Sequence, residues 1–577
     1  MSPLPPEKSG IADYSADLLP ELAKFYDIDV IVAQDTVDNS PRDPRISIRS
    51  AEWFDRHAAA YRRILYHVGS SASHRHMPEM LSRHPGIVVL HDFFLGELFD
   101  CRPPWQDCLP RILFEAHGYP ALIAEFRRGR AEAIRVYPCN SSVLDRANGT
   151  IVHSRFSMHL REQWHGSGSS ADWRYIPIPK PSPDRKARQE ARRRLGIGED
   201  DFVVASFGFV VPFKLNDRLI DAWSSSPMAQ DQRCRLIDVG ECGMPDYAES
   251  LRAANPHGER FAITGFVDRE AYRAYLEAAD IAVQLRLNSR GETSAAILDC
   301  LAYGIPTIIN AHGSAAELPG NSLVKLKEEF SQTDLRDALT LLWRDADLRK
   351  KLSAEAVRHI RTFHDPVRIA RLYRDAIEYF ASTPSRTEQL EDFATAGNVY
   401  GLSRKDIRPQ APCMQVLVDI TDWTRLEEPG LMPLRVALEV LLDAPLEKCR
   451  IETVRWAETH YVYARTFTAN LLKAKAVILE DRPLHILPGD LFLQPLADSH
   501  HQPHRARSQF LAELETRGAR ILDMPEQFLR PGMCASEIRT AFTNWIEPFL
   551  IGDSSSWPTG FGKKAGLKDF NCAGAHP

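Results

Sequence analysis

One segment, residues 286–306, indicates the fold of this protein; its sequence is Arg286-Leu-Asn-Ser-Arg-Gly-Glu292-Thr-Ser-Ala-Ala-Ile-Leu-Asp299-Cys-Leu-Ala-Tyr-Gly304-Ile-Pro306. An apolar run at 281–285 precedes it, and a helical pattern follows Ser294. The segment therefore predicts a strand, a glycine-containing turn and a helix. Thr293 and Ser294 are candidate helix caps, and the free amides of the helix N-terminus favour an anion. A nucleotide diphosphate is one ligand that such a site accepts.

Two acids of this segment are expected to line one cleft. The apolar side chains of the helix, among them Leu298 and Leu301, would face the core. Asp299 would then face away from them, about two turns along the helix from Glu292. A position at the carboxyl end of a strand in an open α/β sheet favours ligand binding. The alternative is a capped core helix whose acids only face solvent.

Short β-branched runs alternate with helical patterns on both sides of this segment, which predicts the α/β fold class with parallel sheets. The strands expected in the N-terminal part are residues 28–33, 64–68, 87–91 and 150–154. Those expected in the following part are residues 202–207, 235–239, 261–264, 281–285, 306–310 and 323–326. Six successive strands are enough for a doubly wound sheet.

Changes in composition predict the organisation of the chain. We expect an N-terminal α/β domain at 1–175 and a second one at 176–381, which begins in the proline-rich stretch 176–183. A linker at 382–412 leads to a partial third α/β unit at 413–551, and the tail 552–577 is expected to be disordered. The strands expected in the third unit are residues 414–420, 450–456, 476–479, 491–493 and 519–522.

Composition excludes several classes of protein. Lys and Arg number 71 against 77 Asp and Glu, so the net charge of −6 supplies no positive field for nucleic acid. Ten cysteines without a CxxC pair form neither a disulfide nor a zinc framework, which favours a cytoplasmic protein. No apolar stretch is long enough to span a bilayer. His500, His501 and His504 are expected to be surface residues rather than metal ligands.

Six motifs resemble family 4 of the retaining, nucleotide-sugar-dependent glycosyltransferases, by their order and spacing over roughly residues 1 to 380. They are Pro5-Pro-Glu-Lys-Ser-Gly-Ile-Ala-Asp-Tyr-Ser15, Val89-Leu-His-Asp92, Gly149-Thr-Ile-Val-His-Ser154, Phe207-Gly-Phe209 followed by Lys214, Thr264-Gly-Phe-Val267, and Gly291-Glu-Thr-Ser294 through Gly304-Ile-Pro306. The resemblance implies the GT-B fold, in which two Rossmann-like domains face each other across a cleft. Residues 1–175 would be the acceptor-side domain and 176–381 the nucleotide-sugar donor domain.

The resemblance also implies roles for individual residues. Glu292 contacts the transferred sugar, Asp299 binds the ribose of the donor, and Lys214 neutralises the diphosphate. His91 lies beside the sugar, and Gly10 lets the backbone approach the donor. The implied catalytic set is Glu292, His91 and Lys214, and the implied donor-binding set is Gly10, Gly208, Lys214, Phe266, Gly291, Glu292, Thr293, Ser294 and Asp299. A core histidine and a solvated loop lysine are the alternatives for His91 and Lys214.

The implied reaction moves a hexosyl group, with retention, from a nucleotide diphosphate sugar to a polysaccharide or lipopolysaccharide acceptor. Loss of the nucleoside diphosphate places positive charge on the sugar and negative charge on the phosphate, which a lysine and helix amides stabilise. Mannose from GDP-mannose is the first donor expected, the acceptor is an oligosaccharide or a lipid-linked glycan, and neither metal nor cofactor is required. Two alternatives stay open: an inactive nucleotide- or glycan-binding remnant, and a nucleotide-sugar epimerase on the same fold.

Three departures from the family pattern are visible. Glu292 and Asp299 stand one residue closer together than the two glutamates of the family, and the second acid is shorter. No arginine occurs shortly before Lys214, so Arg286 and Arg290 are candidates to replace it. Only Met1 precedes the stretch Ser2-Pro-Leu-Pro-Pro6, so the central strand of the N-terminal sheet is expected to be missing, at a cost in stability.

Two further segments carry weaker predictions. The third unit resembles the opening half of a second glycosyltransferase module, through Val416-Leu-Val-Asp-Ile420, Tyr461-Val-Tyr-Ala-Arg465 and Pro488-Gly-Asp-Leu-Phe-Leu493. We expect it to be inactive and to serve docking or acceptor binding. The basic run at 185–194 is a candidate for peripheral contact with the inner membrane, with a solvated helix face as the alternative.

Overall fold

The computed structural model describes residues 1–37, 43–100, 108–183, 187–254, 257–383, 414–427, 430–443, 449–474, 479–484, 486, 489–495, 505–516, 518–525 and 533–550. Several predictions therefore lie outside the described residues: the linker from residue 384, most of the strand at 476–479, the three histidines at 500–504, and the tail. The chain forms two compact units. The first unit comprises residues 1–98, 142–163 and 167–407, and the second comprises residues 99–141, 164–166 and 408–577.

The middle domain, which we define as residues 187–363 of the first unit, contains a parallel sheet over its described residues. Its strands, in spatial order, are β12 (Val324–Leu326), β11 (Thr307–Asn310), β10 (Ile281–Gln284), β7 (Phe202–Phe207), β8 (Cys234–Val239) and β9 (Phe261–Ile263). Each follows the predicted run to within one residue. The order is that of a Rossmann sheet, in which the chain reverses direction between its first and fourth strands. Here those strands are β7 and β10.

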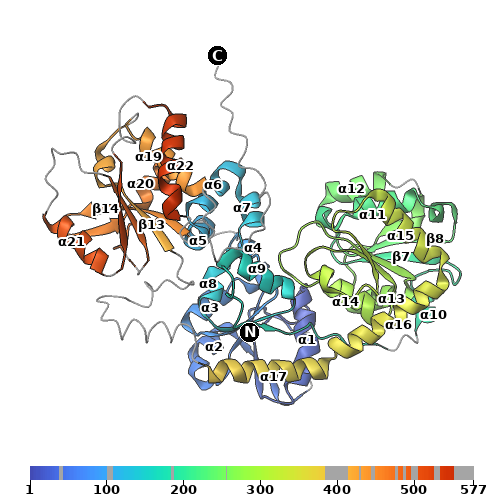
Figure 1. Cartoon of the computed structure of the whole chain (residues 1–577). Helices are drawn as coiled ribbons and strands as arrows, with labels where there is room; N and C mark the ends of the chain where they lie inside the picture. The colour runs from blue at the N-terminus through green and yellow to red at the C-terminus, as the bar shows by residue number, and fades with distance from the viewer. Residues whose placement is uncertain are drawn as a thin grey trace. The chain divides into compact units, whose positions relative to one another are not determined.

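Helices cover both faces of this sheet (Figure 1). One face carries α11 (Asn216–Ser224), α12 (Pro245–Ala253) and α15 (Gln332–Arg344), and the other carries α10 (Arg188–Arg194), α13 (Arg269–Ala278) and α14 (Ala295–Ala302), with α16 (Ala346–Phe363) packed beside α14. Successive side chains of β7 lie on opposite faces of the sheet. Val204 packs in one core cluster with Leu219 and Leu335, whereas Val203 packs in another with Leu276. This two-sided burial explains why the central strands are mostly apolar.

The N-terminal domain is also α/β. One parallel sheet has the order β3 (Leu65–Val68), β4 (Gly86–Leu90), β5 (Ala147–Val152) and β6 (Arg174–Tyr175), and β1 (Ile28–Val32) pairs with β2 (Ile46–Ser50) in a separate parallel sheet. Its helices are α1 (Gly10–Leu22), α2 (Ala51–His57), α3 (Met77–Arg83), α4 (Gly96–Phe99), α8 (Ser141–Leu144), α9 (Arg155–His165) and the returning α17 (Pro366–Ser382). The α/β fold class predicted from the sequence is confirmed.

Two residues lie between the two N-terminal sheets. The amide of Ser2 donates to the carbonyl of Ile31 in β1 over 3.1 Å, and the carbonyl of Met1 accepts from the amide of His67 in β3 over 3.0 Å. Met1 and Ser2 thus occupy the position at which the family's central strand was expected. β1 and β3 belong to different sheets.

The second unit contains a mixed sheet whose order is β15 (His460–Tyr463), β14 (Cys449–Ala457), β13 (Met414–Asp419), β16 (Leu491–Pro495) and β17 (Arg520–Met524). Only the β14–β15 pair of these described strands is antiparallel. Its helices are α5 (Cys108–His117), α6 (Tyr119–Arg128), α7 (Arg130–Val136), α19 (Met432–Asp443), α20 (Arg465–Leu471), α21 (Arg505–Thr516) and α22 (Ala535–Leu550).

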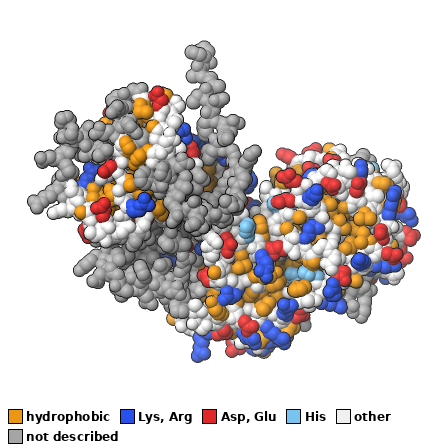
Figure 2. Space-filling model, viewed as in Figure 1, with side chains coloured by type: hydrophobic (Ala, Val, Ile, Leu, Met, Phe, Trp, Pro, Cys, Tyr) orange, Lys and Arg blue, Asp and Glu red, His pale blue; other side chains and the backbone are white. Residues whose placement is uncertain are grey.

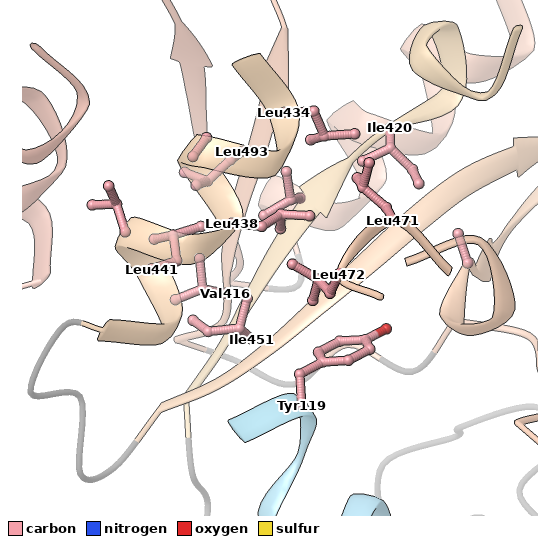
Figure 3. Packing of buried hydrophobic residues seen from close by; sticks show 14 of the residues in the cluster. Tyr119, Val416, Ile420, Leu434, Leu438, Leu441, Ile451, Leu471, Leu472 and Leu493 are labelled. Atoms are coloured by element: carbon pink, nitrogen blue, oxygen red, sulfur yellow. The ribbon is translucent and has the colours of Figure 1, made fainter. Parts of the chain in front are cut away.

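The grouping of α5, α6 and α7 differs from the expected boundaries, which placed residues 99–141 in the N-terminal domain. Phe114, Tyr119 and Leu122 are almost fully buried in the hydrophobic core that also contains Val416 and Leu438. Figure 3 shows the Tyr119 ring directed from its helix toward Leu472 and Ile451 of the C-terminal part. Helices α5 and α6, which stand in the N-terminal half of the sequence, therefore complete this core of the second unit, and Ala133 of α7 packs in a separate cluster with Leu113 and Ala121.

The described surface carries mixed charge. On the face shown in Figure 2, basic and acidic side chains are interspersed over the middle domain. The basic run is helix α10, in which Arg192 is buried and pairs with Asp280 over 2.7 Å, and Arg188 pairs with the same carboxylate over 2.6 Å. Two arginines of α10 thus form ion pairs within the middle domain. Among the described residues, no helix is both long and apolar enough to cross a membrane.

Candidate active site

The candidate site lies where the middle sheet reverses its strand order. In such a sheet the loops that leave the carboxyl ends of the two central strands run to opposite faces, and a crevice opens between them. Gly208 follows β7, and Leu285 and Arg286 follow β10. The loop after β10 then carries Glu292 and leads into α14. The sequence-predicted residues Gly208, Lys214, Gly291 and Glu292 therefore come from the two loops that border this crevice.

Lys214 lies against the loop that follows β7. Its Nζ is 3.4 Å from the carbonyl oxygen of Phe207, and a Cβ on Gly208, whose φ is +94°, would lie only 2.6 Å from that nitrogen. The positive φ favours glycine at 208, and a larger side chain there would displace the end of the Lys214 side chain. Burial and the nearby charge of Arg286 lower the pKa of Lys214 to about 7, although Asp238 opposes the shift. A charged ammonium at this position is poorly solvated, so an anionic ligand would stabilise it.

Arg286 and Glu292 form an ion pair at the mouth of the loop after β10. The Ser289 hydroxyl also donates to Glu292 Oε2 over 3.2 Å, and the Arg290 amide donates to the same oxygen. These contacts fix the carboxylate. Burial lowers the pKa of Arg286 to about 10, so the guanidinium is still charged at neutral pH.

A pocket opens beside this pair. It contains about 350 Å³ of space, open solvent included. Its polar lining comes from the ends of β10 and β11 and from the loops that follow them: Gln284, Arg286, Ser289, Glu292, Ser294, Asn310, His312 and Ser314. Glu292 and Ser294 are thus the predicted site residues that line it. His312 Nε2 is buried and has no hydrogen-bond partner among the described residues.

The start of α14 is capped by one of the two predicted residues. Ser294 is the N-cap, and its side chain accepts a hydrogen bond from the amide of Ile297. The hydroxyl of Thr293 is buried and has no partner within the described part of the chain. The helix N-terminus therefore presents a hydroxyl and free amides next to Glu292, as binding of an anion requires.

Asp299 extends from α14 as predicted, but it is not free. The ammonium of Lys180 donates to its Oδ1 over 2.6 Å, and the Tyr272 hydroxyl reaches its Oδ2 at 3.4 Å. About a fifth of the Asp299 side chain is exposed. The sequence pattern contained no signal for Lys180, because the lysine stands in the proline-rich connector between the two domains.

The loop after β10 also contacts the N-terminal domain. The amides of Phe93 and Phe94 donate to the carbonyl of Arg290, and the Ser157 hydroxyl donates to the carbonyl of Gly291 over 2.6 Å. The side chain of Arg290 pairs with Glu97. Of the two arginines proposed to replace the missing one, Arg290 is therefore engaged across the domains, whereas Arg286 lies beside Lys214.

His91 follows β4 and lies in a buried aromatic cluster rather than in the pocket. Its Nε2 is 3.2 Å from His67 Nδ1, and its ring centre lies 4.8 Å from that of Tyr14 and 4.7 Å from that of His153. Burial, together with the neighbouring histidines, lowers the pKa of His91 well below its ordinary value. The residue is therefore a neutral imidazole at physiological pH.

Phe266 and Gly10 lie outside the pocket lining. Phe266 is more than half exposed, and the ammonium of Lys8 sits 4.1 Å from its ring centre. Gly10 begins α1, and a Cβ there would meet no atom within 4 Å. Among the described residues, no group of three or more His, Cys, Asp or Glu side chains is arranged to hold a metal ion.

Comparison with known proteins agrees with this description. Residues 187–359 match the family model described as Glycosyl transferases group 1. These residues form a group 1 glycosyltransferase domain, which is less than half of the chain. No curated protein matches the sequence.

Solved structures show likenesses of fold. HepE from Anabaena, in complex with UDP and glucose, has 16% identity and a TM-score of 0.47, and the match covers 65% of this chain and 97% of that one. WaaG, a glycosyltransferase involved in lipopolysaccharide biosynthesis, has 16% identity and a TM-score of 0.45, with coverage of 64% and 96%. Sucrose-phosphate synthase from Thermosynechococcus elongatus has 16% identity and a TM-score of 0.44, with coverage of 65% and 93%.

Proposed function

We propose that this protein is a retaining, metal-independent glycosyltransferase that moves a hexosyl group from a nucleotide diphosphate sugar to a polysaccharide or lipopolysaccharide acceptor. One observation carries the proposal. Two cationic side chains, Lys214 and Arg286, and the N-terminus of α14 converge at the carboxyl ends of β7 and β10. This combination suits a diphosphate, because it supplies the Arg286 guanidinium, a lysine whose charged form an anion favours, and free amides in a partly desolvated crevice.

The proposed reaction has a simple balance. The bond between the anomeric carbon and the phosphate oxygen breaks, a bond from the acceptor hydroxyl oxygen to that carbon forms, and the hydroxyl proton passes to the departing diphosphate. Lys214 and Arg286 stabilise the negative charge that develops on this leaving group. Glu292 is fixed by Arg286 and Ser289, so its carboxylate is positioned to hold the sugar. Mannose from GDP-mannose is the first donor to test.

The test measures release of nucleoside diphosphate from a panel that includes GDP-mannose, UDP-glucose and UDP-galactose, with and without oligosaccharide acceptors, in EDTA. We expect one donor to react, faster with acceptor, and the product to keep the anomeric configuration. Glu292→Ala is expected to lower the rate by about 100-fold or more. Glu249→Ala, at an exposed position on α12, is the matched control and should leave the rate unchanged.

Other outcomes identify the alternatives. Saturable nucleotide-sugar binding without release under any acceptor condition would indicate an inactive remnant. Conversion of the donor into another nucleotide sugar without acceptor would indicate an epimerase. Neither binding nor release would overturn the assignment of the site.

A further inference from the structure

The Lys180–Asp299 pair links three parts of the first unit. Lys180 belongs to the connector between the two domains, and its side chain is about nine-tenths buried. Its backbone amide donates to the carbonyl of His364 over 2.8 Å, while His364 Nδ1 donates to the carbonyl of Ile178 over the same distance. The lysine is therefore anchored to the junction of α16 and α17. From there its ammonium reaches Asp299 on α14.

Other carboxylates also face this ammonium. Burial by itself lowers the pKa of Lys180, but the charges of Asp299, Asp17 and Asp13 outweigh burial and hold the pKa above its ordinary value. Arg269 partly neutralises the two acids on α1, because it lies 2.9 Å from Asp17 and 3.9 Å from Asp13. Lys180 is thus a stable cation, and its closest anionic partner is Asp299.

The Asp299 carboxylate can accept further hydrogen bonds beside these contacts. An ionised carboxylate has about four lone-pair positions, two on each oxygen. Lys180 takes one position on Oδ1, and Tyr272 takes one on Oδ2. One position on each oxygen is left for further donors. The partial exposure of the side chain allows a ligand to reach them.

Two adjacent hydroxyls of a ribose supply donors in this arrangement. We propose that Lys180 is a positioning residue that holds the Asp299 carboxylate in one orientation, so that its two oxygens accept the 2′- and 3′-hydroxyls of the donor ribose. The inference rests on the proposed function, since it needs a nucleotide in the crevice. It also explains how an aspartate can serve although it is shorter than the glutamate of the family: a buried ammonium fixes its rotamer.

The experiment compares the affinities of GDP and 2′-deoxy-GDP, and of UDP and 2′-deoxy-UDP, by calorimetry. Removal of a hydrogen bond to a charged group weakens binding by about 10-fold or more, so the wild-type protein should prefer the ribonucleotides by that factor. In Lys180→Met, the ratio of the affinities for the ribonucleotide and the 2′-deoxyribonucleotide should be close to one. Lys180→Arg, which keeps the charge, should retain most of it. Lys351→Met, at an exposed position on α16, is the matched control.

Inorganic diphosphate serves as the internal reference, because it occupies only the site at Lys214 and Arg286. Unchanged diphosphate binding in Lys180→Met shows that the domain is folded and that the change concerns the ribose. Equal weakening of ribo- and deoxyribonucleotides would give Lys180 a merely structural role and overturn the inference. Equal binding of both nucleotide types by the wild-type protein would overturn it as well. Absence of all nucleotide binding would instead overturn the proposed function itself.

Discussion

The Lys214 ammonium lies against the backbone of Gly208, and this position determines its chemistry. In the free protein its pKa is lowered to about 7, so the side chain is charged below pH 7 and mostly neutral above it. A bound diphosphate would restore the charge by raising the pKa toward the ordinary value. Ligand binding and protonation of this lysine are therefore coupled.

We predict that a nucleotide sugar binds with uptake of nearly one proton at pH 8, and that its affinity falls as pH rises above 7. The diphosphate of a nucleotide sugar has no ionisation in this range, so the proton is assigned to the protein. Calorimetry in two buffers of different ionisation enthalpy measures the uptake. Lys214→Met should bind more weakly and take up no proton, and an unchanged uptake in this variant would contradict the assignment.

Several histidines of the N-terminal domain lie close together because they stand at the ends of neighbouring strands. His67 lies in β3, His91 follows β4, and His153 follows β5, so parallel strands place all three at one edge of the sheet. His153 Nδ1 donates to the carbonyl of Ile176 over 2.8 Å, and burial lowers the pKa of His153 to about 4. These elements are thus stable only with neutral histidines.

The lowered pKa gives this edge a pH-dependent stability. The unfolded chain binds protons at His153 below about pH 6.5, whereas the folded chain does so only below about 4. Stability from this group is therefore complete above pH 6.5 and is lost as pH falls toward 4. We predict a loss of about 2 kcal/mol between pH 7.5 and pH 5 from His153 alone.

Urea unfolding at the two pH values, in the wild type and in His153→Asn, tests this prediction. The asparagine amide can donate to the same carbonyl but does not titrate. Between pH 7.5 and pH 5, the free energy of unfolding of His153→Asn should therefore fall by about 2 kcal/mol less than that of the wild type. Equal losses in the two proteins would show that the histidine is already charged, or already solvated, in the folded state.

The two units have cores that do not follow the order of the chain. Leu122 stands in the N-terminal half of the sequence, yet it is buried in the same hydrophobic cluster as Val416, Leu438 and Leu493. This arrangement makes the second unit dependent on an insertion from the first half. Its stability is therefore a property of the whole molecule rather than of one contiguous segment.

We predict that Leu122→Ala destabilises the second unit by about 2–5 kcal/mol, through the cavity it leaves. Hydrogen exchange of the amides in β13 and β14 should become faster, although these strands are distant in sequence. Leu18→Ala, in α1 of the N-terminal domain, is the matched control and should leave β13 unaffected. Faster exchange in β4 and β5 but not in β13 would contradict the observed core.

The middle domain was the most predictable part of the molecule. Its strands are apolar on both faces, so each is visible as a short continuous run, and the expected runs agree with the observed strands. Strands β2, β6 and β15 were missed, because their short or half-buried sequences give no such run. The insertion helices were assigned to the N-terminal domain by sequence position, since no local pattern reports which core an amphipathic helix joins.

The sequence alone determined the α/β class, the strand, turn and helix around Glu292, and the cap at Ser294, because these follow from local periodicity and local hydrogen bonding. The tertiary structure alone decided the partners: Arg286 beside Lys214, Lys180 on Asp299, and the core that joins residues 99–141 to the C-terminal part. Such contacts join residues far apart in the chain, and their energies depend on burial. Burial is set by the packing of the whole fold, so no single segment of sequence encodes it.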